Sequence, residues 1–530
     1  MTTIITDPHV RQDSDGIYGV LSDLDRPCYL VRTERGVGAT TVAPNHWPNR
    51  QGTVVAALGP LPPQRLGSAR FTARHGTAYA YMTGAMADGI ASEDLVIALA
   101  RAGMLGSFGA AGLLPERVER ALNRFQAELR GLPFAANLIH SPSEDALERG
   151  AVELYLRHRV RCVEASAFMD LTSNVVRYRV AGLRRGANGR PLAENRLIAK
   201  VSRPEVAHRF LLPPPGQIVD DLAARGLISA EQAGLARVVP MADDITVEAD
   251  SGGHTDRRPL TALFGTIVRL RDTVQRELRY ADPPRVGAAG GIGTPQAAAA
   301  AFTLGADYVV TGSVNQSCLE SGTSPAARQL LAAAGIADCE MAPAADMFEL
   351  GVELQVLRKG TLFPMRAKRL YELYRGYGGI DALPPAERAR LEQQVFRRPI
   401  AAVWEDVVAY FTARDPEQLT RAARDPKRKM ALIFRWYLGM ASRWAIAGEP
   451  DRGADYQIWC GPAMGAFNEW VRGTYLAAPE NRRVADVATH LLRGAAFVTR
   501  VHQLALSGVR LPSSCAEYRP VPLNPQLGDA

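Results

Sequence analysis

The chain has 530 residues, 47% of them hydrophobic and 22% charged, which is an ordinary composition for a globular protein with a large core. Its net charge of +7 comes mainly from dispersed arginines, without the basic–aromatic interleaving of nucleic-acid-binding proteins. No apolar run approaches the roughly 18 residues that span a bilayer, and the N-terminus lacks the basic-then-apolar order of a secretion signal. We therefore expect a cytoplasmic protein with neither a membrane segment nor a nucleic-acid partner.

The six cysteines are scattered along the chain and show no CxxC spacing, which a zinc site would usually require. Free thiols in a reducing cytosol are the simplest interpretation. We therefore predict neither a metal site nor a disulfide framework.

The first 70 residues are rich in proline and glycine and contain two short strand-like pieces, at 27–33 and 52–59. Frequent turn residues between short β-branched runs are typical of small β structures. We predict a small β-rich N-terminal module over residues 1–70.

From about residue 77, short β-branched or aromatic runs alternate with alanine-rich segments of helical length. The segments 92–103, 115–131, 204–212 and 295–306 place apolar residues three and four apart, as amphipathic helices do. Near-continuous apolar strands between helices indicate a parallel sheet that is buried on both faces. The predicted strands are 78–84, 104–110, 133–139, 161–167, 196–202, 245–249, 285–291 and 307–313.

Eight such units close most economically into a (β/α)₈ TIM barrel, so we predict an α/β fold of this kind. A doubly wound open sheet is the alternative, but it would place a single glycine-rich fingerprint after the first strand. Here glycines follow several strands, including the late ones. One further strand-like run, at 175–183, leaves the strand count open.

After the eighth strand, residues 336–455 contain helix-like segments with charged faces, broken by glycine and proline. We predict a helical insertion or lid domain there, with residues 71–335 and 456–510 forming the barrel and 511–530 a C-terminal tail. The insertion carries a basic cluster, RAARDPKRKM, at 421–430. Such a cluster is usually a solvated helix face, but it could equally dock an acidic protein.

In a barrel, function gathers where the strands end and the following loops begin. Two glycine-bearing turns, AAGGIGT and VVTGS, follow the predicted strands seven and eight. Backbone N–H groups in such turns, together with a helix N-terminus, can bind a phosphate, although either turn alone could be an ordinary tight connection. The sixth strand runs into Gly252-Gly253-His254, where a proton-handling imidazole follows a flexible backbone.

Several segments, in this order, resemble those of the FMN-dependent nitronate monooxygenase (2-nitropropane dioxygenase-like) barrels. They are GAMADGIASEDLVIALARAGMLGSFGAAG, NLIHSP, EADSGGH, GAAGGIGTPQAAAAAFTLGADYVVTGS and WCGPAMGAF. More narrowly, nearly the whole chain resembles the PfaD-type enoyl reductases. Those enzymes serve polyunsaturated fatty acid synthases and polyketide synthases with trans-acting acyltransferases.

The resemblance implies an FMN-dependent enoyl reductase that takes electrons from NADPH or NADH. Its substrate would be an α,β-unsaturated thioester carried by an acyl carrier protein. Oxidation of alkyl nitronates on the same barrel is the alternative, and a non-catalytic scaffold within a synthase is a third hypothesis. The acyl chain and the oligomeric state, a homo-oligomer included, stay open.

The resemblance also implies which residues hold the flavin ring. Gly84, Ala85 and Met86 would lie against the ring, and Asn137 would hydrogen-bond its polar edge. Lys200 would sit near the electron-accepting end of the ring, where a cation stabilises the anionic reduced form.

Two further sets complete the implied site. Gly252 and Gly253 would let the sixth loop approach the flavin. The phosphate would be held by Gly290, Gly291, Thr311, Gly312 and Ser313.

His254 would face the substrate. Enoyl reduction develops negative charge on the thioester oxygen and requires a proton at the α-carbon, and an imidazole can serve either need. His140, after the third strand, is the competing candidate, for which we favour a structural role. Asp250 could orient His254 or cap its loop.

Overall fold

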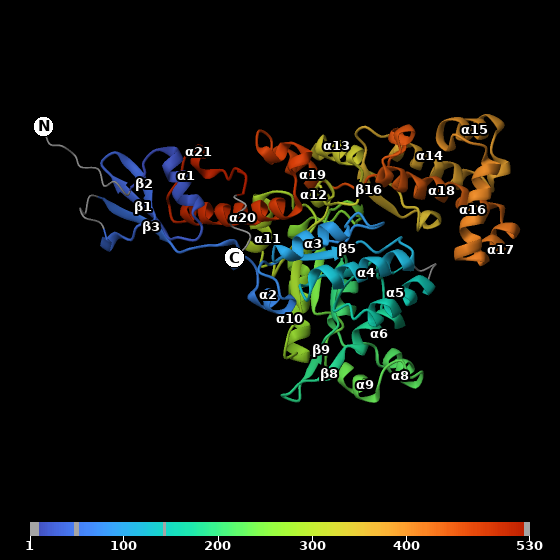
Figure 1. Ribbon diagram of the computed structural model, residues 1–530, viewed down its shortest axis with the longest axis horizontal. Helices are drawn as coiled ribbons and strands as arrows, with labels where there is room; N and C mark the ends of the chain where they lie inside the picture. The colour runs from blue at the N-terminus through green and yellow to red at the C-terminus, as the bar shows by residue number, and fades with distance from the viewer. Residues whose placement is uncertain (1–9, 47–51, 141–144, 524–530) are drawn as a thin grey trace.

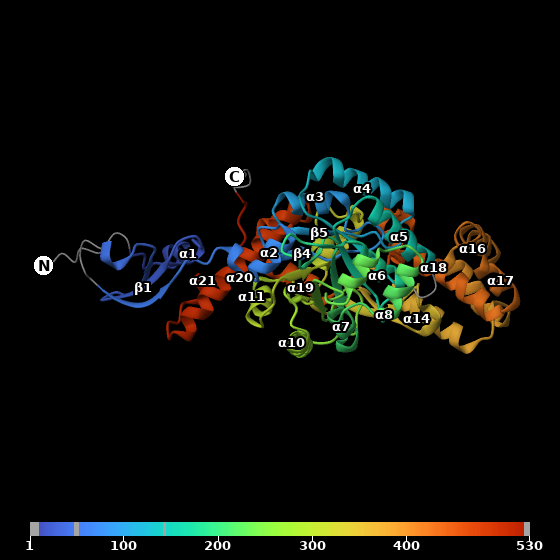
Figure 2. The same ribbon diagram turned by 90° about the horizontal axis from the view of Figure 1, so that it is seen from below.

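The computed structural model describes residues 10–46, 52–140 and 145–523. Along the longest axis of the molecule lie a small N-terminal module, a central barrel and a helical extension (Figures 1 and 2). Within the described ranges, no helix is both long and apolar enough to cross a membrane.

The central part is a closed barrel of eight parallel strands, in which the pairing of Val309 with Tyr81 joins the last strand to the first. Every predicted strand overlaps one of these eight, so the predicted fold class is confirmed. The strands are β4 (Tyr81–Thr83), β5 (Leu105–Phe108), β6 (Ala135–Ile139), β7 (Cys162–Ser166), β10 (Arg196–Val201), β11 (Asp244–Glu248), β13 (Arg285–Ala289) and β14 (Val309–Thr311).

Helices cover the outside of the barrel, as expected for strands that are buried on both faces (Figure 2). They are α2 (Ala69–His75), α3 (Glu93–Arg101), α4 (Pro115–Leu129), α5 (Asp145–Arg157), α6 (Ser173–Ala181), α7 (Pro204–Leu211), α8 (Gly216–Ala224), α9 (Ala230–Ala236), α10 (Leu260–Leu278) and α11 (Pro295–Thr303). The short α12 (Ser313–Gln316) and α13 (Pro325–Ala332) follow the last strand.

The strand-like run at 175–183 is not a strand, because most of it lies in α6. The Thr172 hydroxyl caps this helix by accepting a hydrogen bond from the Val175 N–H at 3.2 Å. Val176 and Val180 are one helical turn apart and both are buried. Burial on one helix face favours a helix here, although β-branched side chains on their own favour strands. The hairpin of β8 (Leu183–Arg185) and β9 (Pro191–Ala193) that follows forms its own two-stranded sheet.

The N-terminal module is an antiparallel sheet of β1 (Cys28–Thr33), β2 (Gly36–Thr40) and β3 (Thr53–Leu58), accompanied by α1 (Ser14–Ser22). Arg500 joins this module to the long helix α20 (Val484–Leu506). Its buried guanidinium donates to the carbonyl oxygens of Leu21 and Asp23 at 3.0 and 2.9 Å. Because this one buried cation binds several carbonyl oxygens of the N-terminal module, it holds the module against α20.

A buried ion-pair cluster occupies the amino end of the barrel strands. Asp244 contacts His75 at 2.8 Å and Arg285 at 2.5 Å, and Asp243 contacts Arg179 at 2.6 Å. Burial raises the pKa of both carboxyl groups, but the adjacent cations outweigh it and hold each pKa below its ordinary value. In barrels this end contributes stability, and chemistry belongs to the opposite end.

The segment after β14 is not wholly helical, so the expectation for 336–455 is wrong in its first part. β15 (Cys339–Pro343) and β16 (Glu353–Leu357) pair as antiparallel strands, and β16 also pairs with β12 (Gly253–His254). Polar Glu353 and Gln355 alternate with apolar Leu354 and Val356, a period of two that specifies a strand.

Helices follow as predicted and extend to the far end of the molecule (Figure 1). They are α14 (Phe363–Gly376), α15 (Pro385–Arg390), a π-helical turn (Leu391–Phe396), α16 (Ile400–Arg414), α17 (Pro416–Arg424) and α18 (Pro426–Ala447). The chain then returns to the barrel through α19 (Pro462–Trp470) and α20, and ends with the short α21 (Ser513–Ala516).

Candidate active site

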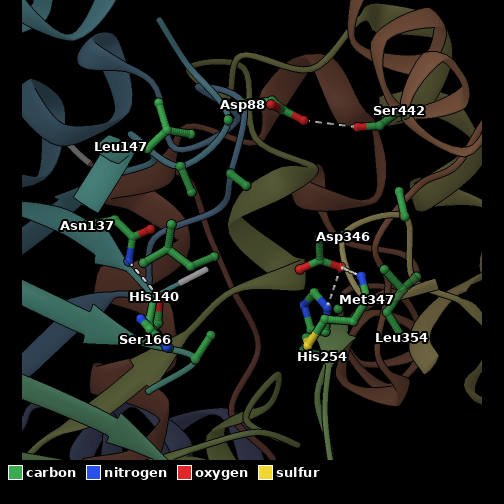
Figure 3. Close-up of a pocket in the computed structure, with 18 of the residues that line it drawn as sticks. Asp88, Asn137, His140, Leu147, Ser166, His254, Asp346, Met347, Leu354 and Ser442 are labelled. Atoms are coloured by element: carbon green, nitrogen blue, oxygen red, sulfur yellow. Dashed lines mark hydrogen bonds and ion pairs between the residues drawn. The ribbon is translucent and has the colours of Figure 1, made fainter. Parts of the chain in front are cut away.

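A cavity of about 1040 Å³ lies at the carboxyl end of the barrel strands. Barrel loops and helices α16 and α18 of the insertion line it together, and Figure 3 shows part of this lining. The predicted residues that line it are Ala85, Met86, Asn137, Lys200, Gly252, Gly253 and His254. The lining does not include Gly84, Gly290, Gly291, Thr311, Gly312 or Ser313.

The strand that carries His254 is held by the insertion. Gly253 pairs with Gln355 and His254 pairs with Leu354 across β12 and β16. The His254 Nε2 atom lies 3.2 Å from Oδ1 of Asp346, which belongs to the loop between β15 and β16 (Figure 3). A residue 92 positions later in the chain thus orients the imidazole.

Electrostatics at His254 favour its protonated form. Burial lowers the pKa of the imidazole, but the hydrogen bond and charge of Asp346, with a contribution from Glu248, raise it above its ordinary value. In return, His254 helps to hold the pKa of Asp346 below its ordinary value against the effect of burial. The pair therefore favours the protonated imidazole more than an isolated histidine does, as a general acid requires.

Asp250 does not orient His254. Its Oδ1 atom accepts a hydrogen bond from Nε2 of Gln355 at 3.0 Å, and the same amide donates to the Ser251 carbonyl oxygen at 2.7 Å. Of the two roles expected for Asp250, the structure supports that of holding the loop, and Asp346 has the other.

Lys200 lies between two carboxylates at the end of β10. Its Nζ atom is 3.3 Å from Glu248 and 3.8 Å from Glu164. Burial lowers the pKa of the ammonium, but Glu248 and Glu164 outweigh it and raise the pKa, so the group is cationic. Glu164 also accepts a hydrogen bond from the Ala85 N–H at 2.8 Å, which ties the loop after β4 to the centre of the site.

Asn137 faces the cavity from β6. Its amide nitrogen donates to the Ser166 hydroxyl at 2.9 Å and to the Glu164 carbonyl oxygen at 3.1 Å (Figure 3). Because both donor positions are used by the next strand, the amide orientation is fixed. The Asn137 side chain is thus a rigid polar group in the cavity lining.

His140 is engaged within the fold, in line with the structural role favoured for it. Its Nδ1 atom lies 2.8 Å from the buried Glu148 carboxylate, and its ring stacks on Phe168. These contacts hold His140 in place at the end of β6. Its side chain also lines the cavity.

Gly252 has a packing role that the sequence did not reveal. A Cβ at this position would lie 2.9 Å from the Cys460 backbone nitrogen, and a Cβ on Gly461 would lie 2.7 Å from the Gly252 nitrogen. Only two glycines allow these backbones to approach so closely. Gly253 differs, since its φ is +82° and nothing lies within 4 Å of a Cβ there.

The two predicted phosphate turns lie after β13 and β14. A Cβ on Gly290 would meet the Ala249 backbone at 2.6 Å, whereas those on Gly291 and Gly312 would face open space. The Ser313 hydroxyl accepts a hydrogen bond from the Gly461 N–H at 3.0 Å, so the segment before α19 joins these turns.

Thr311 and Gly84 make contacts within the barrel. The Thr311 hydroxyl is buried and bonded to Tyr81 at 2.5 Å and to Asn315 at 2.8 Å, so it is not available to a phosphate. Gly84 donates its N–H to the Thr311 carbonyl oxygen at 2.9 Å and continues the barrel pairing.

The basic cluster at 421–430 mostly contacts its own domain. Lys427 donates to the Tyr377 carbonyl oxygen at 2.6 Å, Arg428 pairs with Glu349, and Arg421 pairs with Glu417. These contacts leave the cluster with less free charge than its sequence suggests.

Across the ranges that the structure describes, no group of three or more histidine, cysteine, aspartate or glutamate side chains could hold a metal ion.

Comparison with protein families gives three matches along the chain. A model described as nitronate monooxygenase matches residues 70–366, more than half of the chain. Residues 7–57 match the N-terminal domain of fatty acid synthase subunit PfaD. Residues 377–456 match the inserted helical domain of [acyl-carrier-protein] S-malonyltransferase.

Two curated relatives cover most of the chain. A polyunsaturated fatty acid synthase subunit of Thraustochytrium sp. is 49% identical over 496 residues, which is 91% of this chain and 32% of that protein. Polyketide biosynthesis protein PksE of Bacillus subtilis is 46% identical over 430 residues, or 81% of this chain and 56% of that protein. The chain thus spans about a third to about half of the length of these relatives.

A solved structure of an enoyl reductase domain is also similar to this chain. The enoyl reductase domain of MlnA, from the macrolactin biosynthesis cluster of Bacillus amyloliquefaciens, matches with a TM-score of 0.80 and 39% sequence identity. The match covers 84% of this chain and 99% of that domain.

Proposed function

The chain belongs to the nitronate monooxygenase family, and we propose that it is an FMN-dependent enoyl reductase of polyketide or polyunsaturated fatty acid biosynthesis. Its substrate would be an α,β-unsaturated thioester on an acyl carrier protein, and NADPH or NADH would supply the electrons. The observation that carries the proposal is the near-complete match to an enoyl reductase domain, at 39% identity over 99% of that domain.

The residues around the cavity fit a flavin. Lys200 offers a cation held by Glu164 and Glu248, and Asn137 offers a rigid amide in the same cavity lining. Gly291 and Gly312 leave open space where side chains would stand, so their turns can present backbone N–H groups to a phosphate. Bound FMN would supply the hydride, and these residues would hold and polarise it.

His254 is the proposed proton donor, and Asp346 positions it. Reduction of an enoyl thioester needs a proton at the α-carbon and a hydrogen-bond donor for the thioester oxygen. An imidazolium paired with Asp346 at 3.2 Å can serve either need. Barrel and insertion residues together line the cavity that this imidazole faces.

The proposal is tested with purified protein reconstituted with FMN. We expect the protein to bind FMN, NADPH or NADH to bleach the flavin absorbance near 450 nm, and an acyl-carrier-bound crotonyl thioester to restore it. A protein that takes up no FMN would contradict the proposal.

Nitronate oxidation is the second candidate, favoured by the family model over residues 70–366. A stopped-flow comparison separates the two. Rapid flavin reduction by an alkyl nitronate, with none by NADPH or NADH, would replace the reductase proposal with the oxidase.

A further inference from the structure

A glycine interrupts the cavity face of the long helix α18. Leu432, Trp436, Gly439 and Arg443 follow one another at helical spacing, so they share one face of the helix, and all of them line the cavity. Gly439 is half-buried in the middle of this face. Glycine loses more conformational freedom in a helix than alanine does, so a glycine at such a position needs a physical reason.

Two common reasons for a glycine do not apply to Gly439. It does not have a positive φ, so no left-handed backbone conformation requires it. Apart from its chain neighbours and the surrounding helix backbone, no atom of the described residues lies within 4 Å of a Cβ built at this position. Close packing, which explains Gly252, therefore does not explain Gly439. The missing side chain leaves space in the cavity itself.

This part of α18 lies close to the proposed proton donor. Arg435, one turn before Gly439, is 3.4 Å from Glu349, in the loop between β15 and β16 that also carries Asp346. The charge of Arg435 contributes to the lowered pKa of Asp346, which is the partner of His254. A substrate whose reacting carbons lie at His254 is therefore near the turn of α18 that contains Gly439.

Apolar side chains form the cavity lining beside this turn. Val407 and Phe411 of α16 cluster with Leu432, Trp436 packs against them, and all four line the cavity. Ser442, on the other side of Gly439, contacts the Asp88 carboxylate, so the polar groups of this helix face are separate from the apolar ones (Figure 3). Burying hydrocarbon on such an apolar surface is favourable, whereas burying an unpaired amide is costly. The apolar cluster therefore suits the acyl chain of a thioester better than its pantetheine arm.

We propose that Gly439 determines acyl-chain selectivity, because the chain of the enoyl thioester passes over this glycine from His254 to the apolar cluster of Val407, Phe411, Leu432 and Trp436. The inference rests on the proposed function and adds a specificity-determining residue to it. A side chain at position 439 would occupy space that a long acyl chain needs and that a short one does not reach.

The size of the cavity agrees with a long acyl chain. Its volume of about 1040 Å³ is at the upper end of the ~300–1,000 Å³ of typical small-molecule sites. The barrel strands supply Lys200 and Asn137, whereas α16 and α18 supply the apolar cluster. In this arrangement the barrel holds the reacting end of the substrate and the insertion holds its hydrocarbon end.

The test compares two substrates on the FMN-loaded enzyme, crotonyl-pantetheine and trans-2-decenoyl-pantetheine, which differ only in chain length. Gly439→Leu should lower the ratio of kcat/KM for the decenoyl to that for the crotonyl thioester by roughly tenfold or more, and Gly439→Ala by a smaller factor. Gly265→Leu is the matched control and should keep the wild-type ratio. Gly265 also lies inside a long helix, α10, with open space at its Cβ, but it is not among the described residues that line the cavity.

Thermal unfolding of the FMN-loaded protein without substrate gives a second readout. Gly439→Ala should raise the Tm, because alanine favours the helix and its methyl group would enter open space. A lower Tm would show that packing explains the glycine and would overturn the inference.

The outcomes separate this inference from the proposed function. Equal losses for both thioesters in Gly439→Leu would mean that the glycine is a hinge, or that it meets the pantetheine arm common to both, and would refute the inference while the enzyme remains a reductase. If the wild-type protein reduces neither thioester, the proposed function fails. Calorimetric titration with saturated decanoyl-pantetheine still tests the inference in that case: binding should be weaker in Gly439→Leu than in the wild-type protein and in Gly265→Leu, and equal binding by all three would refute it.

Discussion

Replacing Asp346 with asparagine separates the charge that supports His254 from the hydrogen bond that orients it. Asparagine is close in size to aspartate, and its side-chain oxygen can still accept a hydrogen bond from the imidazole. The substitution therefore removes a negative charge 3.2 Å from Nε2 and leaves the loop between β15 and β16 otherwise intact.

The size of the effect follows from distance and exposure. At 3.2 Å, Coulomb's law gives about 5 kcal/mol at an effective dielectric constant of ~20 and about 1.3 kcal/mol at ~80. The side chains of His254 and Asp346 are 38% and 44% exposed, so the strongly screened value applies. We expect a loss of about 1 kcal/mol, or roughly fivefold, in the step that needs the proton.

The assay is the pH dependence of kcat/KM for a crotonyl thioester. Asp346 raises the pKa of His254, so Asp346→Asn should lower it and move the alkaline limb of the profile to lower pH. Rates should converge as the pH falls and the imidazole becomes protonated in both enzymes, and should differ more as the pH rises. The same raised pKa stabilises the folded state at low pH, and this contribution is lost as pH rises through the folded-state pKa. Superimposable profiles for the two proteins would refute the reasoning.

Further outcomes are expected at the centre of the site and in its packing. His254→Ala should slow enoyl reduction by about 10²–10⁴-fold in single-turnover measurements, and wild-type-like turnover would move the proton donor elsewhere. Lys200→Gln removes the cation between two carboxylates, so the reduction potential of bound FMN should fall; an unchanged potential would separate Lys200 from the flavin. Gly252→Ala should lower the unfolding free energy by about 1–3 kcal/mol, because the new methyl group meets the Cys460 backbone at 2.9 Å. Gly265→Ala is its control: the space there is open, so thermal unfolding should show no loss of stability.

The barrel could be predicted because its strands are buried on both faces. Strands that are buried on both faces appear in the sequence as short apolar runs, and each of the eight predicted runs overlaps a barrel strand. The run at 175–183 was also strand-like but is not a strand. Val175 and Val176 favour strands locally, whereas their burial against neighbouring helices favours α6. It also missed β16, whose alternation of polar and apolar residues is short and sits within a region of helices.

The residues of the candidate site also differ in whether the sequence could predict them. Residues at strand ends, such as Asn137 and Lys200, could be predicted because the barrel brings all carboxyl ends together. Asp346 could not, because no periodicity places a loop of the insertion against a particular strand. The lining role of Gly253 was predictable from its position, but the close approach of Gly252 to Cys460 depends on a segment 208 residues later.

The pairing of β12 with β16 makes the insertion part of the site. β12 contributes only Gly253 and His254, and its neighbour in the sheet is β16. A two-residue strand has too few backbone hydrogen bonds to hold its own conformation, so its geometry depends on the strand beside it. Asp346 comes from the same inserted segment and contacts the imidazole. The insertion therefore positions the proposed proton donor, so the geometry of the acid depends on the inserted segment.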